Sequence, residues 1–457
     1  MFFLVLRPMN LSSFHAFARA FVVCFFLITA IPAFSQTADS PAPDTTEKSF
    51  STRFQETLVD QAHPAFSALY SGRNSLSNGP ENNVSVTSTF YFGARLWKGA
   101  ELYFNPEMTG GTGFTSGTGM AGFPNGEIYR VSNPAPVIFL ARLYGSFTFA
   151  LGNSSAFVDE DENQIAGMKS NDRFVLTLGR FSVTDFFDDN AYSHEPRTQF
   201  LNWSLMDNAV WDYPADTRGY TVGAIAELIH PDWALRFAAV MVSTTANGDT
   251  LDTRIGEAHA FAFEYEHSYS LGGQPGKIRA FVFENVSQAG TYADAINNPQ
   301  DSMNVDLTHK YGTIKYGGGI GFEQAFSADL GAFLRAGWSD GQTEAWMFTP
   351  IDQSISAGAI LKGTGWNRPA DAIGLAVVMN GLSQVHAQYL EDGGYDFNIG
   401  DGKLNYAPET IVEAYYNAQT WWHPLSVGVD YQFCVNPAYN KDRGPINIFG
   451  ARAHVEL

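Results

Sequence analysis

The chain has 457 residues and a formal net charge of −20 at pH 7, and only 16% of its residues are charged while 14% are aromatic. So acidic a surface repels nucleic acid and argues against a nucleic-acid-binding protein. Charged residues are scarcer than the roughly 25% of ordinary soluble domains, yet beyond residue 35 no apolar stretch reaches the ~18 residues of a spanning helix. A helical membrane protein is thereby excluded, and a membrane β-barrel or a large soluble β-protein is left.

Residues 1–35 are predicted to be a secretory signal peptide. Arg7 and Arg19 supply positive charge, residues 20–34 form an almost unbroken apolar run, and small residues allow cleavage before Gln36. The alternative is an N-terminal membrane anchor, for which the apolar run is short. Without this leader the chain carries 25 basic and 47 acidic residues, a net charge of −22.

Residues 36–49 are predicted to be a short periplasmic tether, because they are polar and proline-containing and offer no core residues. Residues 50–457 contain neither a linker nor a helical period and are predicted to form one β-barrel domain. A single cysteine, Cys434, follows the leader, so no intramolecular disulfide is expected. More than 400 residues are long for one soluble core, but a barrel wall can grow strand by strand.

Segments along the domain alternate between apolar and polar residues with the period of two that is typical of strands. In the last segment, Phe449 and Leu457 share an apolar face, which Arg452 and Glu456 oppose. The same pattern occurs in residues 84–97, 137–149, 233–241, 315–323, 334–338, 412–422 and 427–433.

In residues 137–149 the parity of the residue number, odd or even, gives the face of the strand. It predicts that Val137 and Phe139 share the apolar face of Leu143, opposite Arg142. The polar faces contain few lysines, unlike a solvated exterior. The apolar faces have aromatic residues near strand ends, as in an interfacial girdle. We therefore predict an all-β fold, a transmembrane antiparallel β-barrel with long extracellular loops. The last strand would pair with the first and leave no open edge in lipid.

The segment Asp185–Gly219 is a long connection that contains two tryptophans, two arginines and six aspartates. Connections this long are usually functional or disordered, and this one is too aromatic for disorder. Folded into a lumen it would narrow the passage, so we predict these constriction residues: Asp185, Asp188, Arg197, Trp203, Trp211 and Arg218. A loop packed on the barrel rim is the alternative.

No catalytic residue, metal site or cofactor is predicted. Gly337–Gly341 matches the nucleophile-elbow pattern, but a β-patterned run follows it instead of the required helix. The acidic run Asp159–Asn163 lacks the turn glycine and the closing glutamate of a calcium loop and is interpreted as a solvated loop. The chain is therefore not expected to be an enzyme.

The chain resembles the carbohydrate-selective porin family, the OprB-type outer-membrane channels. The resemblance rests on strings of residues along the whole mature chain: Gly179-Arg180-Phe181, Asp185-Phe186-Phe187-Asp188, Asn190-Ala191-Tyr192, Arg197 to Trp203, Tyr213-Pro214, Arg218-Gly219-Tyr220, Tyr406 to Glu409, Tyr431-Gln432-Phe433, Asn436 to Asn440 and Arg443-Gly444-Pro445. It implies a barrel of about 16 strands in the outer membrane of a Gram-negative bacterium. The terminal Leu457 departs from the aromatic residue that commonly ends such strands.

By this resemblance the chain is expected to be a porin for passive diffusion of small carbohydrates, such as glucose, into the periplasm. Parity predicts the following pore-lining set: Arg95, Arg142, Arg236, Arg335 and Arg452, facing Glu323, Glu413 and Asp430. The alternative role for each arginine is a structural ion pair that holds the wall. Expected partners are small sugars, outer-membrane lipid and lipopolysaccharide, and the barrel-assembly machinery. A general or anion-preferring porin and a secreted glycan-binding β-protein are the alternative functions.

Overall fold

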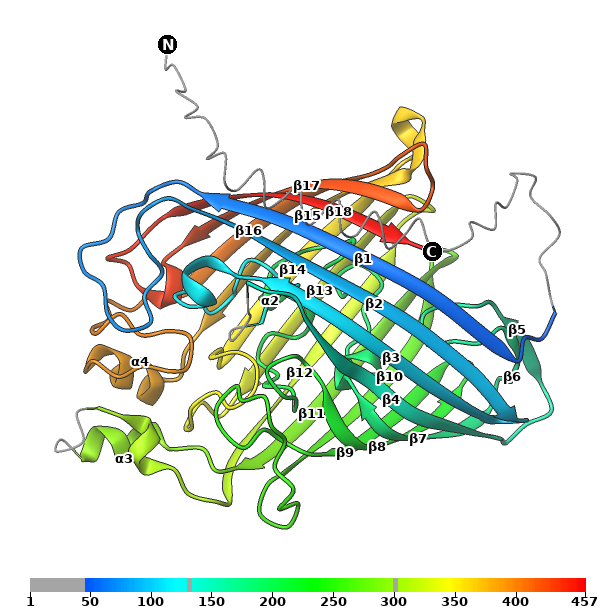
Figure 1. The fold of residues 1–457 in the computed structure, drawn as a ribbon, viewed down its shortest axis with the longest axis horizontal. Coiled ribbons are helices and arrows are strands. Elements are labelled where there is room, and N and C mark those ends of the chain that lie inside the picture. The colour runs from blue at the N-terminus through cyan, green and yellow to red at the C-terminus, as the bar shows by residue number, and fades with distance from the viewer. Residues whose placement is uncertain (1–45, 130–133, 299–302) are drawn as a thin grey trace. The chain divides into compact units, whose positions relative to one another are not determined.

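A computed structural model describes residues 46–129, 134–298 and 303–457, and sixteen of the strands in these residues close into one antiparallel barrel (Figure 1). The predicted signal peptide (1–35) and most of the predicted tether (36–49) lie outside the described residues. The last barrel strand pairs with the first, with Gln55 opposite Glu456 and Ala62 opposite Phe449. The predicted barrel class, its strand number and the closing role of the C-terminal strand are confirmed.

The barrel strands follow one another around the wall in chain order. They are β1 (Phe50–His63), β2 (Glu81–Trp97), β3 (Ala100–Gly111), β4 (Val137–Ala150), β7 (Arg173–Phe181), β8 (Thr221–His230), β9 (Trp233–Val240), β10 (His259–Leu271), β11 (Gln274–Ser287), β12 (Thr313–Ala325), β13 (Leu330–Ser339), β14 (Gln353–Gly363), β15 (Arg368–Gly381), β16 (Glu409–Gln419), β17 (Leu425–Val435) and β18 (Ile446–Glu456).

Smaller elements lie in the connections. Strands β5 (Ser155–Val158) and β6 (Gly167–Ser170) form a separate hairpin. The helices and 3₁₀ turns are α2 (Trp203–Met206), α3 (Tyr292–Asn297), α4 (Gln384–Glu391), η1 (Phe114–Ser116), η2 (Val183–Asp185), η4 (Val305–Thr308), η5 (Thr364–Trp366) and η6 (Pro437–Tyr439). In the described parts of the chain, no helix has both the length and the apolar character needed to cross a membrane.

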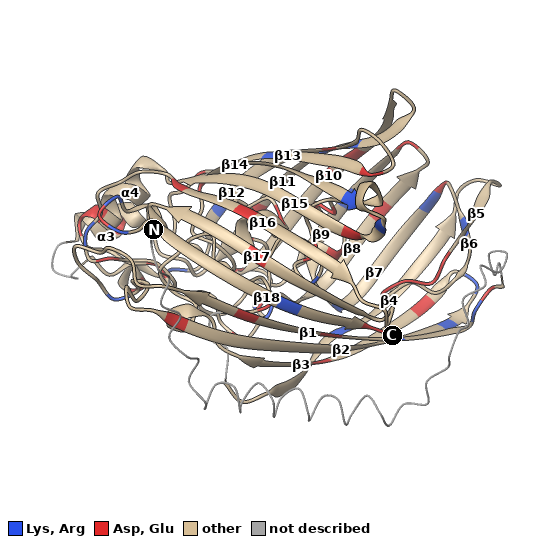
Figure 2. Ribbon diagram, turned by 90° about the horizontal axis from the view of Figure 1, so that it is seen from above, with Lys and Arg blue, Asp and Glu red and all other residues tan. Residues whose placement is uncertain are grey.

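The two faces of the wall differ as strand parity predicts. On β17 and β18, Val429 and Phe449 point outward and are 62% and 54% exposed, whereas Asp430 and Arg452 point inward and are buried. Acidic and basic residues also occur along other strands of the barrel (Figure 2). An apolar outside with a charged inside is the arrangement of a barrel in lipid, the reverse of a soluble protein.

The predicted orientation of Val137 and Phe139 is wrong. Asn105 of β3 pairs with Arg142, but the next residue, Pro106, pairs with Leu140, so Ala141 is an extra residue in β4. Such a β-bulge reverses the alternation on its far side. Phe139 therefore faces the interior, and Ile138 faces outward with 74% exposure.

The connections at the two barrel ends differ strongly in length. Turns of two to five residues occupy one end (98–99, 231–232, 272–273, 326–329, 364–367 and 420–424), together with the longer connection 151–172 that contains the β5–β6 hairpin. The other end carries only longer connections: 64–80, 112–136, 182–220, 241–258, 288–312, 340–352, 382–408 and 436–445. We call it the long-loop end, and α3 and α4 lie there (Figure 1).

A buried histidine fastens three connections at the long-loop end. His386 of α4 lies between two carboxylates, with Nδ1 2.8 Å from Asp352 Oδ2 and Nε2 2.6 Å from Asp396 Oδ2. Tyr292 of α3 stacks on the imidazole at 4.2 Å and donates its hydroxyl to Asp396. Burial alone would lower the pKa of His386, but the two carboxylates outweigh it and raise that pKa to about 9. The cluster therefore holds a charged imidazolium at neutral pH.

Candidate functional site

The connection between β7 and β8, residues 182–220, crosses the interior of the barrel, and we call it the crossing loop. Inward-facing carboxylates on three strands accept hydrogen bonds from its backbone: Glu264 from Asp188 N (2.7 Å), Glu323 from Ala191 N (2.9 Å) and Glu413 from Leu201 N (2.5 Å) and Asn202 N (3.0 Å). Charged acceptors make strong hydrogen bonds with backbone amides. The loop is thus held inside the barrel at several points of the wall.

Two wall arginines hold the same loop through its carbonyl groups. Arg335 is 2% exposed and donates to Leu205 O (2.9 Å) and Ser193 O (2.6 Å), and its Nε lies 2.9 Å from Asp188 Oδ2. Arg452 donates to Gln199 O at 2.9 Å. These two arginines belong to the predicted lining set and face inward, and the hydrogen bonds that they donate go to carbonyl groups of the loop.

A third wall arginine, Arg142 of β4, binds a side chain of the loop. Its Nε and Nη2 donate to Asp185 at 2.7 and 2.6 Å, the two-pronged geometry that suits a guanidinium and a carboxylate. The guanidinium carbon lies 5.2 Å from the ring centre of Tyr220. The third nitrogen, Nη1, is enclosed and makes no hydrogen bond within the described residues. One donor of Arg142 is therefore buried without a partner in the described residues.

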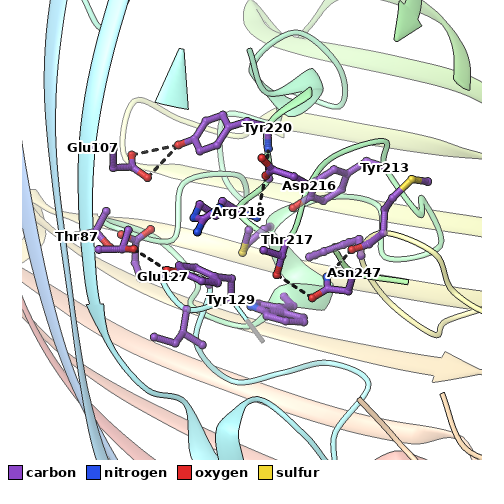
Figure 3. A pocket seen from close by; sticks show the side chains of 18 of the residues that line it. Thr87, Glu107, Glu127, Tyr129, Tyr213, Asp216, Thr217, Arg218, Tyr220 and Asn247 are labelled. Carbon is purple, nitrogen blue, oxygen red and sulfur yellow. Dashed lines mark hydrogen bonds between the residues drawn. The ribbon is translucent and has the colours of Figure 1, made fainter. Parts of the chain in front are cut away.

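Tyr220, whose ring lies next to Arg142, lines a recess of about 650 Å³ (Figure 3). Aromatic rings and charged groups line it together, including Tyr129, Phe139, Tyr213, Glu107, Arg197 and Arg218. The Arg218 guanidinium lies 5.5 Å from the Tyr129 ring and 5.0 Å from the Phe139 ring. Tyr220 donates its hydroxyl to Glu107 at 3.1 Å.

A second recess, of about 990 Å³, lies on the Asp185 side of the same ion pair. Its lining includes Tyr103, Tyr144, Lys169, Asp189, Glu227 and Arg236. Arg236 contacts three carboxylates: Glu264 at 2.7 Å, Glu227 at 3.3 Å and Glu266 at 3.5 Å. The Arg142–Asp185 pair thus lies between two polar recesses.

The connection that contains the β5–β6 hairpin covers part of the interior at the barrel end opposite the long-loop end, which we call the short-turn end. Arg95, a predicted lining residue, binds Glu101 at 3.2 Å and the carbonyl of Ala166. Arg53 of β1 donates to the carbonyl of Glu160 at 3.0 Å, and Glu160 pairs with Lys48 at 2.5 Å. The acidic run Asp159–Asn163 therefore contacts Arg53 of the wall and Lys48 in the last part of the predicted tether.

Of the remaining predicted residues, Asp430 lies on the wall, and Arg197, Trp203 and Trp211 belong to the crossing loop itself. Asp430 accepts from Gln432 at 3.1 Å beside the loop anchor Glu413. Arg197 is close to Glu127 (3.1 Å) and Glu107 (3.7 Å). Trp203 lines the first recess, whereas Trp211 is fully buried against Phe187 and Phe281. Trp211 therefore packs the loop and does not line either recess.

Sequence reasoning missed several inward charges next to the predicted ones. Glu264 and Glu266 alternate with outward Phe263 and Tyr265 on β10, and Arg279 of β11 bonds Glu266 and Glu323 at 2.8 Å each. The same parity rule, applied to these two strands, would have found all three. The absence of a nucleophile elbow at Gly337–Gly341 agrees with the structure, because β13 ends at Ser339 and no helix follows in residues 340–352. The β-patterned run after it forms no strand, only the single bridge of Thr343 with Thr291.

The chain is similar to several solved structures. Pseudomonas putida OprB, in its high-pH structure, is 15% identical with a TM-score of 0.68 over 90% of this chain and 94% of that one. The channel DcaP of Acinetobacter baumannii is 10% identical with a TM-score of 0.49, over 89% and 97% of the two chains. OmpT of Vibrio cholerae is 10% identical with a TM-score of 0.45, over 91% and 100%.

The OprB likeness shows a shared fold. None of the curated protein sequences matches the chain. The sequence profile described as Carbohydrate-selective porin, OprB family, matches residues 73–457. A sixteen-stranded barrel with a charged, loop-crossed interior and this profile match give one conclusion: the chain belongs to the carbohydrate-selective porin family OprB and is an outer-membrane channel.

Proposed function

We propose that the channel lets small neutral carbohydrates, monosaccharides such as glucose, diffuse passively into the periplasm. The observation that carries this proposal is the Arg142–Asp185 pair between two recesses, the first of which combines aromatic rings with charged groups. A sugar would pass from the first recess to the second beside this pair. The pair and the crossing loop form the constriction.

The lining of the first recess suits the chemistry of a sugar. A monosaccharide has hydroxyl groups that need hydrogen-bond partners and C–H faces that pack on aromatic rings. Tyr129, Phe139 and Tyr213 supply rings, while Glu107 and Arg218 supply charged partners. Binding must remain weak for the solute to leave, and a row of such partners meets this need better than one tight site.

Pairing of the interior charges argues against the anion-preferring alternative. Arg142, Arg197 and Arg236 each lie within 4 Å of at least one carboxylate. Their positive fields are therefore partly neutralised, which favours a neutral polar solute over phosphate or a dicarboxylate. Among the other predicted lining residues, we assign Arg335, Arg452, Glu323 and Glu413 to holding the crossing loop, the structural role that was the alternative for the arginines.

The remaining features of the proposal concern the membrane. The long-loop end would face the outside and the short-turn end the periplasm, as in other bacterial barrels. Residues 1–35 would direct export, and the barrel-assembly machinery would insert the chain. Outer-membrane lipid and lipopolysaccharide would contact the apolar outer wall.

Proteoliposome swelling tests the proposed selectivity. Vesicles that contain the mature protein are diluted into glucose, a disaccharide, succinate or phosphate, and the initial swelling rates are compared. We expect glucose to enter faster than size alone predicts, with succinate and phosphate slower than glucose. Rates that depend only on solute size would contradict carbohydrate preference, and faster phosphate entry would support the anion-preferring alternative.

A further inference from the structure

Three metal-ligating side chains from two connections meet at the long-loop end. Asp306 lies in η4 and His309 directly follows it, whereas Glu344 lies in the connection between β13 and β14. His309 Nε2 is 2.6 Å from Glu344 Oε1 and 3.8 Å from Asp306 Oδ1, and all three donor atoms lie within 4.8 Å of one another. None of these residues lines either recess.

The two connections are already joined beside this cluster. Thr291 and Thr343 form an antiparallel bridge, and Glu344 N donates to Gly290 O at 3.2 Å. Gly290 N in turn donates to Glu344 Oε1 at 2.7 Å, which fixes the direction of a carboxylate whose side chain is 3% exposed. A carboxylate oriented in this way is preorganised as a ligand.

The imidazole of His309 is also held in place but lacks a satisfied nitrogen. Its ring packs edge-on against Trp346, with 5.3 Å between ring centres. Nε2 is enclosed, and in spite of its closeness to Glu344 it makes no well-aligned hydrogen bond with any described residue. Two carboxylates facing one imidazole also leave at least one negative charge without compensation. Both observations indicate that a cation would fit here.

We propose that Asp306, His309 and Glu344 bind a divalent transition-metal ion of the zinc class. Zinc takes imidazole nitrogen at about 2.0–2.1 Å and carboxylate oxygen at about 2.0–2.2 Å, and it completes four ligands with water. Ligand atoms in that tetrahedron are roughly 3.3 Å apart, so His309 Nε2 and Glu344 Oε1, now 2.6 Å apart, would separate when the metal binds. The Asp306 side chain, which is 51% exposed, can rotate to bring its oxygen closer. Calcium and magnesium prefer oxygen ligands alone, so the imidazole selects against them.

Metal binding would connect the outer surface to the proposed sugar path. Glu344 lies shortly before Met347 and Phe348, which line the first recess. A metal bound by Asp306, His309 and Glu344 would fasten η4 to this lining segment and make it more rigid. The site itself does not depend on the proposed function, because its residues lie outside both recesses.

Titration calorimetry with Zn²⁺ on the mature, detergent-folded barrel tests the site. We expect one Zn²⁺ per chain, with affinity reduced at least tenfold in His309→Ala and in Glu344→Gln. Asp306→Asn changes an exposed side chain that the fold does not need, and it should weaken binding without altering heat-modified gel mobility. His423→Ala, an exposed histidine in the turn between β16 and β17, is the matched control and should bind like the wild type.

Several results would overturn the metal site. Unchanged Zn²⁺ affinity in Asp306→Asn together with His309→Ala would place any bound zinc elsewhere. Equal affinity for Ca²⁺ and Zn²⁺ would show that the imidazole does not take part. Sugar flux is not a readout of this experiment, so a failure of the metal site and a failure of the proposed carbohydrate path are distinguishable.

Discussion

Arg142→Ala removes the side chain that lies between the two recesses. In the wild type Arg142 makes two hydrogen bonds to Asp185, at 2.7 and 2.6 Å, and keeps Nη1 unbonded. Breaking a fully buried ion pair costs about 3–5 kcal/mol. The Asp185 side chain is 25% exposed, so water can solvate the remaining carboxylate, and we expect a stability loss of about 1–3 kcal/mol.

The effect of Arg142→Ala on the solute should be larger than its effect on the fold. Each hydrogen bond lost to a sugar hydroxyl removes about 0.5–1.5 kcal/mol, which weakens binding roughly two- to tenfold. We therefore expect the glucose concentration that half-blocks the single-channel current to rise by this factor. Removal of the guanidinium also widens the passage, so the disaccharide-to-glucose ratio of swelling rates should increase.

Arg95→Ala is the matched control for the Arg142 experiment. Arg95 is another inward arginine paired with a carboxylate, Glu101 at 3.2 Å. Unlike Arg142, it contacts neither Tyr220 of the first recess nor Asp185 of the second. Its replacement should leave glucose block unchanged. If Arg142→Ala folds normally and keeps the wild-type half-block concentration, the constriction does not lie at this pair.

Glu413→Ala should lower the unfolding temperature in detergent, because two buried amides, Leu201 N and Asn202 N, lose their acceptor, and each loss costs about 1–3 kcal/mol of stability. The unfolding temperature of Glu413→Gln should fall between those of Glu413→Ala and the wild type. Equal stability of all three proteins would contradict the anchoring role. Val429→Lys places a charge on the outer wall and should cost up to about 2–4 kcal/mol near the bilayer midplane, whereas Val429→Leu should be neutral. Equal stability of both variants in lipid would mean that this face is not in the membrane. The pKa of His386 is raised from 6.5 to about 9, so the stability it contributes is fully present below about pH 6.5 and is lost as the pH rises through about 9. Proteolysis of the loops at pH 7 and pH 10 should show this loss in the wild type, and the same pH dependence in His386→Ala would contradict it.

The barrel could be predicted because one rule acts on every strand of it. Lipid requires that each outward side chain be apolar, and the strand period of two then fixes which residues face inward. That rule found Arg142, Arg236 and Asp430 on the inner face without any knowledge of the loops. It failed at Val137 and Phe139, because the extra residue Ala141 changes the register and leaves no mark in the hydrophobic pattern.

The site could be predicted only in part, because parity gives the face of a strand but not what covers that face. Arg335 and Arg142 have the same parity signal and both are buried, yet Arg335 donates to the backbone of the crossing loop. Arg142 instead contacts Tyr220, which lines the first recess, and Asp185, which lines the second. The difference depends on where residues 182–220 run inside the barrel. Contacts between residues more than a hundred positions apart, such as Arg335 with Ser193, determine that path.

An inward charged residue can either hold the crossing loop or interact with the solute, and the sequence does not distinguish these two roles. The group that the residue binds in the structure does distinguish them. Arg335 donates mainly to backbone carbonyls, and a donor bound to backbone holds the loop and has little to offer a passing solute. Arg142 and Arg236 instead face carboxylate side chains, which can exchange hydrogen bonds with sugar hydroxyls as the solute moves. A wall that contained only backbone-bound charges would make a rigid constriction without solute partners. A wall of side-chain pairs alone would leave the crossing loop unsupported. On the proposed function the channel needs both kinds, and their division between Arg335 and Arg142 would let an interior so rich in charge suit the neutral sugar that we propose as its solute.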